Sequence, residues 1–208
     1  MLKILAPKKR SLGFLSSANQ NNTIIFITIC YLIGILVGVL LFKNKSTSDN
    51  NYYKEFSQLY SQLTLGFMEN FGYSLLRELP FIAGIFLAGS CMVGGIIVPA
   101  IILLRGALYG IIMGYTCFNY GLTGIVFNLL ILIPPAVIWA LALILSARES
   151  FGFSICLARL VLPESNSGRL DKDFKIYCLR QLFVLLFFLL GAFIQTLMAV
   201  SFIDFFKL

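Results

Sequence analysis

The chain contains no Lys, Arg, Asp or Glu between Arg105 and Arg148, a run of 42 residues. About 20 apolar residues are enough to cross the hydrocarbon core of a bilayer as a helix. The run is therefore twice the length of one span, and its middle carries the turn-like sequence Asn-Tyr-Gly-Leu-Thr-Gly at 119–124. It predicts two membrane helices joined by a tight hairpin.

The composition of the whole chain agrees with a membrane solvent. Apolar residues make up 59% of the 208 residues and charged residues 12%, whereas a soluble domain has about 25% charged residues. The net charge of +7 comes from basic residues that flank apolar segments, which favours the lipid bilayer as partner and argues against nucleic acid. We expect one all-α polytopic membrane helix bundle that comprises residues 1–208 as a single domain.

The residue types needed for common catalytic and metal sites are missing. The chain has no histidine, and its five cysteines are dispersed without a C-x-x-C spacing. No P-loop, G-x-S-x-G or H-E-x-x-H motif occurs, and no base accompanies the available Ser and Thr residues. We expect a protein that is not an enzyme and has no catalytic residues, no cofactor and no metal site.

Five spans and their orientation follow from hydropathy and charge. With the N-terminus inside, the cytoplasmic segments 1–22, 148–181 and Arg105 carry 11 basic residues, and the opposite side carries 5. The positive-inside rule therefore predicts a cytoplasmic N-terminus, an extracytoplasmic loop at 43–79 and an extracytoplasmic C-terminus. The expected spans are Thr23–Phe42, one within Pro80–Leu104, Gly106–Asn119, Ile125–Ala147 and one within Leu182–Ile203.

The third expected span is short, since its length of ~21 Å falls below the ~30 Å core of a bilayer. Either it extends across Arg105, whose side chain then snorkels to the interface, or it is a re-entrant element, which would place the C-terminus in the cytoplasm. The chain has almost no intramembrane charge on this reading, because Arg105, Arg148 and Glu149 all lie at span ends.

Glycines four residues apart predict a close helix contact. They share one helix face and let another backbone approach there, and we expect a packing face formed within the bundle or with a partner. The candidates are Gly34 and Gly38 in the first span and Gly106, Gly110 and Gly114 in the third.

Polar and proline residues inside the last two spans have mainly structural interpretations. Pro134 and Pro135 remove two backbone donors and predict a kink in the fourth span, which either shapes the bundle or forms a transport site. Asn119 and Asn128 are expected in turn and packing roles. Gln195 is expected to hydrogen-bond to another helix.

Aromatic and aliphatic residues recur every three or four positions in the first outer loop, which predicts an amphipathic helix at the membrane interface. Its apolar face has two compatible interpretations, a lid packed on the bundle and a docking face for an extracytoplasmic partner. The residues of this face are Tyr52, Phe56, Leu59, Tyr60, Leu63 and Phe67.

Several landmarks recur in the order typical of one family. They are Leu104-Arg105-Gly106, Gly110, Gly114-Tyr115, the Tyr-Gly-Leu-Thr-Gly of 120–124 and the Ile-Leu-Ile-Pro of 131–134, after a basic N-terminus and the amphipathic loop. Over nearly its whole length the chain resembles the stage II sporulation protein M family of endospore-forming bacteria. Many broader members carry Pro-His-Gly where this chain has Pro134-Pro135-Ala136, so it resembles the sporulation branch more closely.

The resemblance implies a non-enzymatic membrane scaffold for engulfment of the forespore. In that family the protein recruits the peptidoglycan-degrading stage II sporulation proteins D and P, which would be the expected partners here. The alternative is a small permease or channel subunit, motivated by the broken fourth helix and the glycine-rich third helix. Assembly as a homo-oligomer is left open by the sequence.

Overall fold

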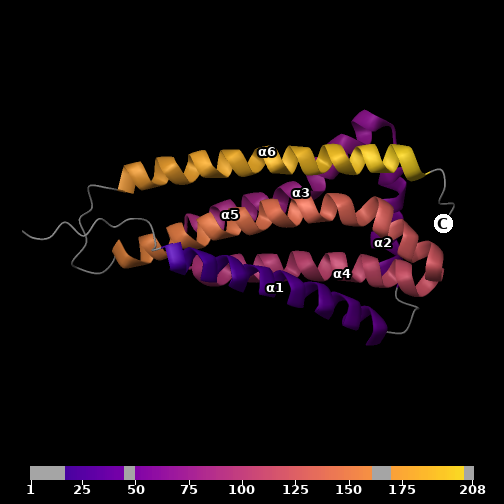
Figure 1. Ribbon diagram of the computed structural model, residues 1–208, viewed down its shortest axis with the longest axis horizontal. Coiled ribbons are helices and arrows are strands. Elements are labelled where there is room, and N and C mark those ends of the chain that lie inside the picture. Colours follow the sequence, from indigo (N-terminus) through magenta and orange to yellow (C-terminus); the bar gives the residue numbers. More distant parts are fainter. Residues whose placement is uncertain (1–16, 45–49, 161–169, 204–208) are drawn as a thin grey trace, which may run out of the picture.

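The fold is a bundle of long helices. A computed structural model describes residues 17–44, 50–160 and 170–203, and within these ranges the chain is helical and forms no strand. Figure 1 shows the long helices side by side, with α2 across one end of the bundle. The elements are α1 (Ser17–Asn44), α2 (Asn50–Leu63), α3 (Phe67–Gly89), α4 (Gly94–Phe127), a π-helical turn η1 (Asn128–Leu132), α5 (Ile133–Leu160) and α6 (Leu170–Phe202).

Four helical stretches of the described chain are long and apolar enough to cross a membrane: Asn21–Phe42, Phe67–Gly89, Gly94–Ala158 and Phe174–Phe202. The third has 65 residues and would extend ~100 Å if it were straight, far more than a bilayer requires. It reverses at Gly121, whose φ of 54° and ψ of −126° are not helical. The chain therefore makes five passes, which confirms the expected all-α membrane bundle.

The second and third spans differ from the sequence expectation. We expected the second within Pro80–Leu104 and the third at Gly106–Asn119, but α3 already ends at Gly89 and α4 begins at Gly94. The short connection is held by Ser154 of α5, whose hydroxyl donates to the carbonyl oxygen of Cys91 at 2.9 Å and accepts from the amide of Gly95 at 3.0 Å. The third pass is thus a full-length helix, and a re-entrant element is not needed.

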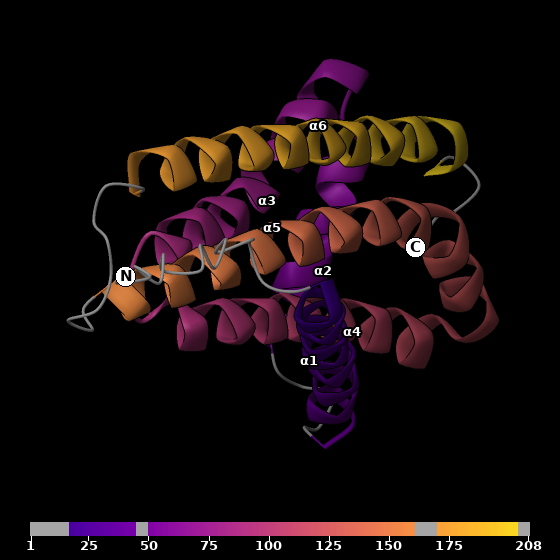
Figure 2. The same cartoon turned by 60° about the vertical axis from the view of Figure 1, so that its left-hand side comes forward.

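The helix α1 packs along α4, and both views place it at the edge of the bundle opposite α6 (Figures 1 and 2). The glycines of the two helices face each other there. A Cβ atom added to Gly34 would meet the backbone of Leu103, and one added to Gly38 would meet the backbone of Ala107.

The glycines of α4 make the reciprocal contacts. A Cβ at Gly106 would strike the carbonyl oxygen of Tyr31, and one at Gly110 that of Ile35, whereas Gly114 has ordinary contacts with the ring of Phe42. The predicted glycine face is therefore used inside the chain, where it lets the α1 and α4 backbones touch.

The amphipathic helix α2 lies with its apolar face against the bundle. Phe56, Leu59 and Leu63 are buried in a cluster with Phe127 and Ile131. The side chain of Tyr60 is partly buried, and Phe67 is partly exposed at the start of α3, with its ring 6.0 Å from that of Phe193. The side chain of Tyr52 lies outside the described residues. The structure thus shows the packed lid, with the centre of this face buried; docking of a partner on the rest of the face stays a prediction.

The prolines of the fourth span follow the π-helical turn. Pro134 and Pro135 follow η1 without a break in the helix, so the π-helical turn lies where their missing backbone donors interrupt the regular hydrogen-bond ladder. The reversal of the chain lies upstream at Gly121. The two arms are tied there because Thr116 donates to the side-chain oxygen of Asn128 at 2.9 Å.

Candidate functional site: a buried ion cluster in the bundle

Two charged residues meet near the middle of the membrane-spanning helices. Glu78 lies near the centre of α3, and Arg105 lies well inside α4, between its start at Gly94 and the reversal at Gly121. Both side chains are almost completely buried, with exposed fractions of 2% and 3%. Arg105 therefore does not snorkel to the interface, and the expectation that charges occur only at span ends is wrong.

The carboxylate of Glu78 is the hub of the cluster. It accepts a hydrogen bond from Nε of Arg105 at 2.9 Å and is paired with the Nη2 atom of the same guanidinium. The hydroxyl of Tyr109 donates to its Oε1 atom at 3.4 Å, and Nη2 of Arg77 lies 3.5 Å from that oxygen. We call Arg77, Glu78, Arg105 and Tyr109 the ion cluster.

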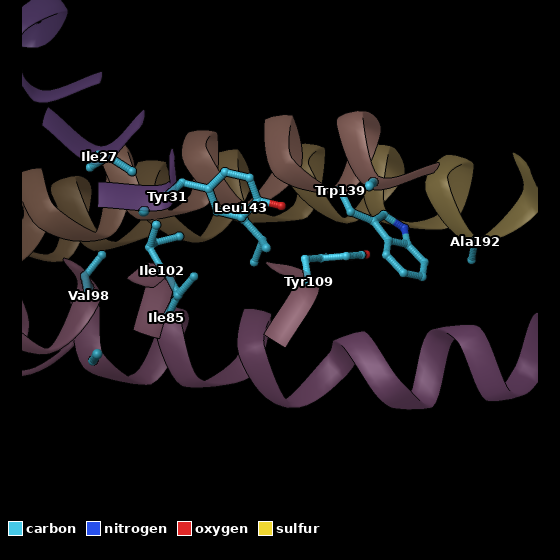
Figure 3. Close-up of a cluster of buried hydrophobic side chains, with 12 residues drawn as sticks. Ile27, Tyr31, Ile85, Val98, Ile102, Tyr109, Trp139, Leu143 and Ala192 are labelled. Carbon is cyan, nitrogen blue, oxygen red and sulfur yellow. The ribbon is translucent and has the colours of Figure 1, made fainter. Parts of the chain in front are cut away.

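Aromatic rings cover the two guanidinium groups. The Cζ atom of Arg105 lies 4.1 Å from the ring centroid of Tyr109 and 4.8 Å from that of Phe81, while Cζ of Arg77 lies 5.9 Å from the ring of Trp139. Figure 3 shows Tyr109 and Trp139 among the aliphatic side chains of the core. Ring faces attract cations, so these contacts replace part of the lost hydration.

The cluster carries more positive than negative charge. Two guanidinium groups share one carboxylate, and in the described part of the chain no second carboxylate is paired with Arg77 or Arg105. Removing charges from water is expensive, and intramembrane charges are usually paired with one another. A balance of two cations and one anion is therefore an unusual arrangement in this position.

A small cavity lies beside the cluster, underneath α2. Its volume of about 10 Å³ matches one water molecule. Leu59 and Leu63 of α2 line it on one side, and Arg77 and Tyr109 bring the ion cluster to its wall. Its other lining residues are Ile131, Leu132, Pro135 and Gln195.

Gln195 does not have the role expected for it. Its side chain is buried, with 5% of its surface exposed, yet none of the hydrogen bonds found among the described residues involves its amide. Instead it lines the cavity together with Arg77. An amide in the wall of a cavity can donate to and accept from a molecule inside it.

A second polar network lies at the end of the bundle away from α2 (Figure 1). Tyr177 of α6 donates to the carbonyl oxygen of Phe86 in α3 at 2.9 Å and is hydrogen-bonded to Ser150 of α5 at 2.9 Å. Gln181 donates to Ser150 at 3.0 Å. Together with two bonds between Ser146 and Gln181, these bonds link α3, α5 and α6 at this end of the bundle.

The expected span-end charges lie near the same network. Glu149 pairs with Arg180 at 2.7 Å and lies 3.6 Å from Arg148. The side chain of Arg180 is 40% exposed, more than that of either arginine in the ion cluster, so solvent weakens its pairing with Glu149.

The sequence contains a signal for the ion cluster. Two charged neighbours usually mark the end of a span, and this pattern places Arg77 and Glu78 in the loop 43–79. The shortness of the third span pointed the other way, because it required the helix to continue through Arg105. A helix centred on Arg105 needs a counter-charge at the same depth, and Glu78 is the nearest acidic residue before it in the chain.

A comparison of the sequence with models of known protein families assigns the chain to one family. A family model described as Stage II sporulation protein M matches residues 27–200, which include most of all five passes and the whole ion cluster. The chain belongs to the stage II sporulation protein M family. It is therefore a sporulation-associated multi-pass membrane protein, as the resemblance implied. No curated protein and no solved structure matches it.

The ion cluster gives this family member binding and positioning groups. Guanidinium groups, a carboxylate and a phenol can hold charge and form hydrogen bonds, but no Ser, Thr or Cys side chain in the described part of the chain is found hydrogen-bonded to the cluster. Within the described ranges, no group of three or more His, Cys, Asp or Glu side chains could hold a metal ion. Electrostatic organisation of the helices is thus the chemistry that this site supports.

Proposed function

We propose that this protein is a non-enzymatic scaffold that anchors peptidoglycan-degrading enzymes resembling the stage II sporulation proteins D and P during engulfment of the forespore. The family match over residues 27–200 carries the proposal. The closed packing of the bundle supports it further, because the cavity beside the ion cluster has room for about one water molecule.

In this proposal the N-terminus is cytoplasmic and the C-terminus extracytoplasmic. The placement of Arg77 and Arg105 inside helices removes one basic residue from each side of the membrane, so the excess on the N-terminal side is unchanged. The α2 end of the bundle then faces the compartment where cell wall is cut.

Native Cys91 offers a direct test of this orientation. It is exposed in the α3–α4 connection, at the opposite end of the bundle from α2 (Figure 1). In a chain whose other cysteines are replaced by alanine, an impermeant thiol reagent should not label Cys91 in intact cells, while a cysteine introduced at the exposed position Ser61 should react. The reverse pattern would invert the topology. Labelling of both positions would mean that α3, which lies between them, does not cross the membrane.

The outward face of α2 is the docking surface that this proposal assigns to the enzymes. The apolar face of this helix is buried, but Lys54, Gln58, Ser61 and Thr64 are exposed on its other side. The surface is polar and lies at the membrane boundary, as suits a contact with enzymes that act outside the membrane.

Two matched serines test the docking surface. Ser61 and Ser90 are both exposed and both donate to a carbonyl oxygen of their own helix, at 2.9 and 3.2 Å, but they lie at opposite ends of the bundle. Ser61→Arg should reduce co-purification of the two enzymes at least tenfold, and Ser90→Arg should leave it unchanged. If the unmodified protein recovers neither enzyme, the scaffold function is wrong. Equal recovery with both variants would move the docking surface elsewhere.

A transport function is the second candidate, and the ion cluster at mid-depth is the observation that favours it. Charged residues inside membrane proteins often mark an ion or substrate route. Against it, the charges are buried and the adjoining cavity holds about one water molecule. A solute flux through proteoliposomes that disappears in the Glu78→Gln variant would support transport over the scaffold.

A further inference from the structure

We propose that the cavity beside the ion cluster is a binding site for one small monovalent anion, of which chloride is the most abundant example. The site lies between α2, α3, α4, α5 and α6, and Arg77 and Gln195 provide its donors. It is independent of the scaffold function, since it concerns how this chain balances its own buried charge.

The charge of the ion cluster is the first argument. Glu78 is shared by Arg105, which binds it closely, and by Arg77, whose nearest contact to it is 3.5 Å. One positive charge is left over in a low-dielectric interior, where an uncompensated charge is costly. An anion at the Arg77 side of the cluster would make the group neutral.

The unused donors are the second argument. The Nε atom of Arg77 is buried and has no hydrogen-bond partner among the described residues. Gln195, which is 5% exposed as a residue, lines the same cavity wall. Both groups carry N–H donors, so one acceptor in the cavity would satisfy both.

The size of the cavity selects the class of anion. A volume of about 10 Å³ admits a particle the size of a water molecule. A halide ion is only slightly larger, whereas a phosphate, a sulfate or the carboxylate of a peptide would require α2 to move away. A water molecule would also fit, but it would satisfy the donors without neutralising the charge.

The position of the cavity indicates what the ion would do. Arg77 is the less buried arginine of the cluster, with 24% of its side chain exposed against 3% for Arg105, so the anion would bind on the Arg77 side. Leu59 and Leu63 of α2 form part of the cavity wall. Occupancy should therefore stabilise α2 in its closed position on the bundle.

Thermal unfolding of the purified full-length chain in a non-ionic detergent tests the site. Sodium gluconate is replaced by sodium chloride at constant ionic strength, and unfolding is followed through the fluorescence of Trp139, the only tryptophan. We expect Tm to rise with the logarithm of the chloride concentration above Kd, by about 3–6 °C at a tenfold excess over Kd. Bromide should act like chloride, and hydrogen exchange of residues 54–63 should slow in parallel.

Three variants separate this site from general salt effects. Arg77→Gln and Gln195→Leu should each abolish the chloride-dependent rise, and Lys54→Gln, which removes an exposed cation on α2, should retain it. Gln195→Leu preserves side-chain size and keeps the test valid should Arg77→Gln fail to fold. Equal Tm values in chloride and gluconate would mean that water alone fills the cavity. A rise that persists in both cavity variants would mean an adventitious ion elsewhere, and either result overturns the proposal.

Discussion

Replacement of Glu78 by glutamine should strongly destabilise this protein. The substitution keeps the size of the side chain but leaves Arg77 and Arg105 without a counter-charge. Arg105 has 2% of its surface exposed, and its Nε atom lies 2.9 Å from the carboxylate, so water cannot replace the lost partner.

The magnitude follows from the geometry of the pair. Two unit charges about 4 Å apart attract by about 4 kcal/mol at an effective dielectric constant of about 20. Breaking a buried pair by removing one partner costs about 3–5 kcal/mol. We therefore expect Glu78→Gln to lower the free energy of unfolding by about 3–5 kcal/mol.

A double-mutant cycle provides the control. In Glu78→Gln/Arg105→Gln both charges of the close pair are gone and the two amides can bond to each other, so most of the lost stability should return. The unfolding free energies of the four proteins can be measured in mixed micelles through Trp139, which lies beside Arg77. If Glu78→Gln costs less than about 1 kcal/mol, or if the two single effects simply add, the cluster is not the coupled ionic unit described above.

Three further substitutions and one control probe the helix contacts and the chain reversal, each followed by unfolding in the same micelles. Gly38→Ala should cost about 1–3 kcal/mol because its Cβ would meet the backbone of Ala107, whereas Gly72→Ala, with nothing within 4 Å, should not destabilise; equal effects would refute the α1–α4 contact. Leu63→Ala should cost about 2–5 kcal/mol, since this side chain is 1% exposed under α2; a loss below about 0.5 kcal/mol would mean that the lid is not packed. Gly121→Ala should cost about 1–3 kcal/mol because φ is 54° there, and no loss would contradict the sharp reversal.

The membrane class and the glycine contact could be predicted from the sequence because both depend on local patterns. A long uncharged run indicates that its helices lie in a bilayer, whichever neighbours these helices pack against. Glycines at a spacing of four share a helix face whatever lies opposite. The structure added only that Gly34 and Gly38 meet the α4 glycines of the same chain rather than those of a partner.

The sequence predicts that the amphipathic helix forms, but not which surface its apolar face contacts. The spacing of Phe56, Leu59 and Leu63 specified one apolar face, and that pattern is the same for a lid, a docking face or a helix lying on lipid. Only the arrangement of the bundle offers the apolar surface, around Phe127 and Ile131, that covers it.

The sequence by itself determined that the chain is a helical membrane protein, which segments are apolar and that its first outer loop holds an amphipathic helix. It could not determine the ion cluster, because hydropathy treats a charged residue as the end of a span whether or not it has a partner. Only the tertiary structure decides this: the connection at 90–93 sets α3 and α4 side by side in antiparallel register, which brings Glu78 to Arg105 at the same depth. A charge becomes tolerable inside the membrane through a neighbour distant in sequence, and this neighbour exists only once the helices have packed.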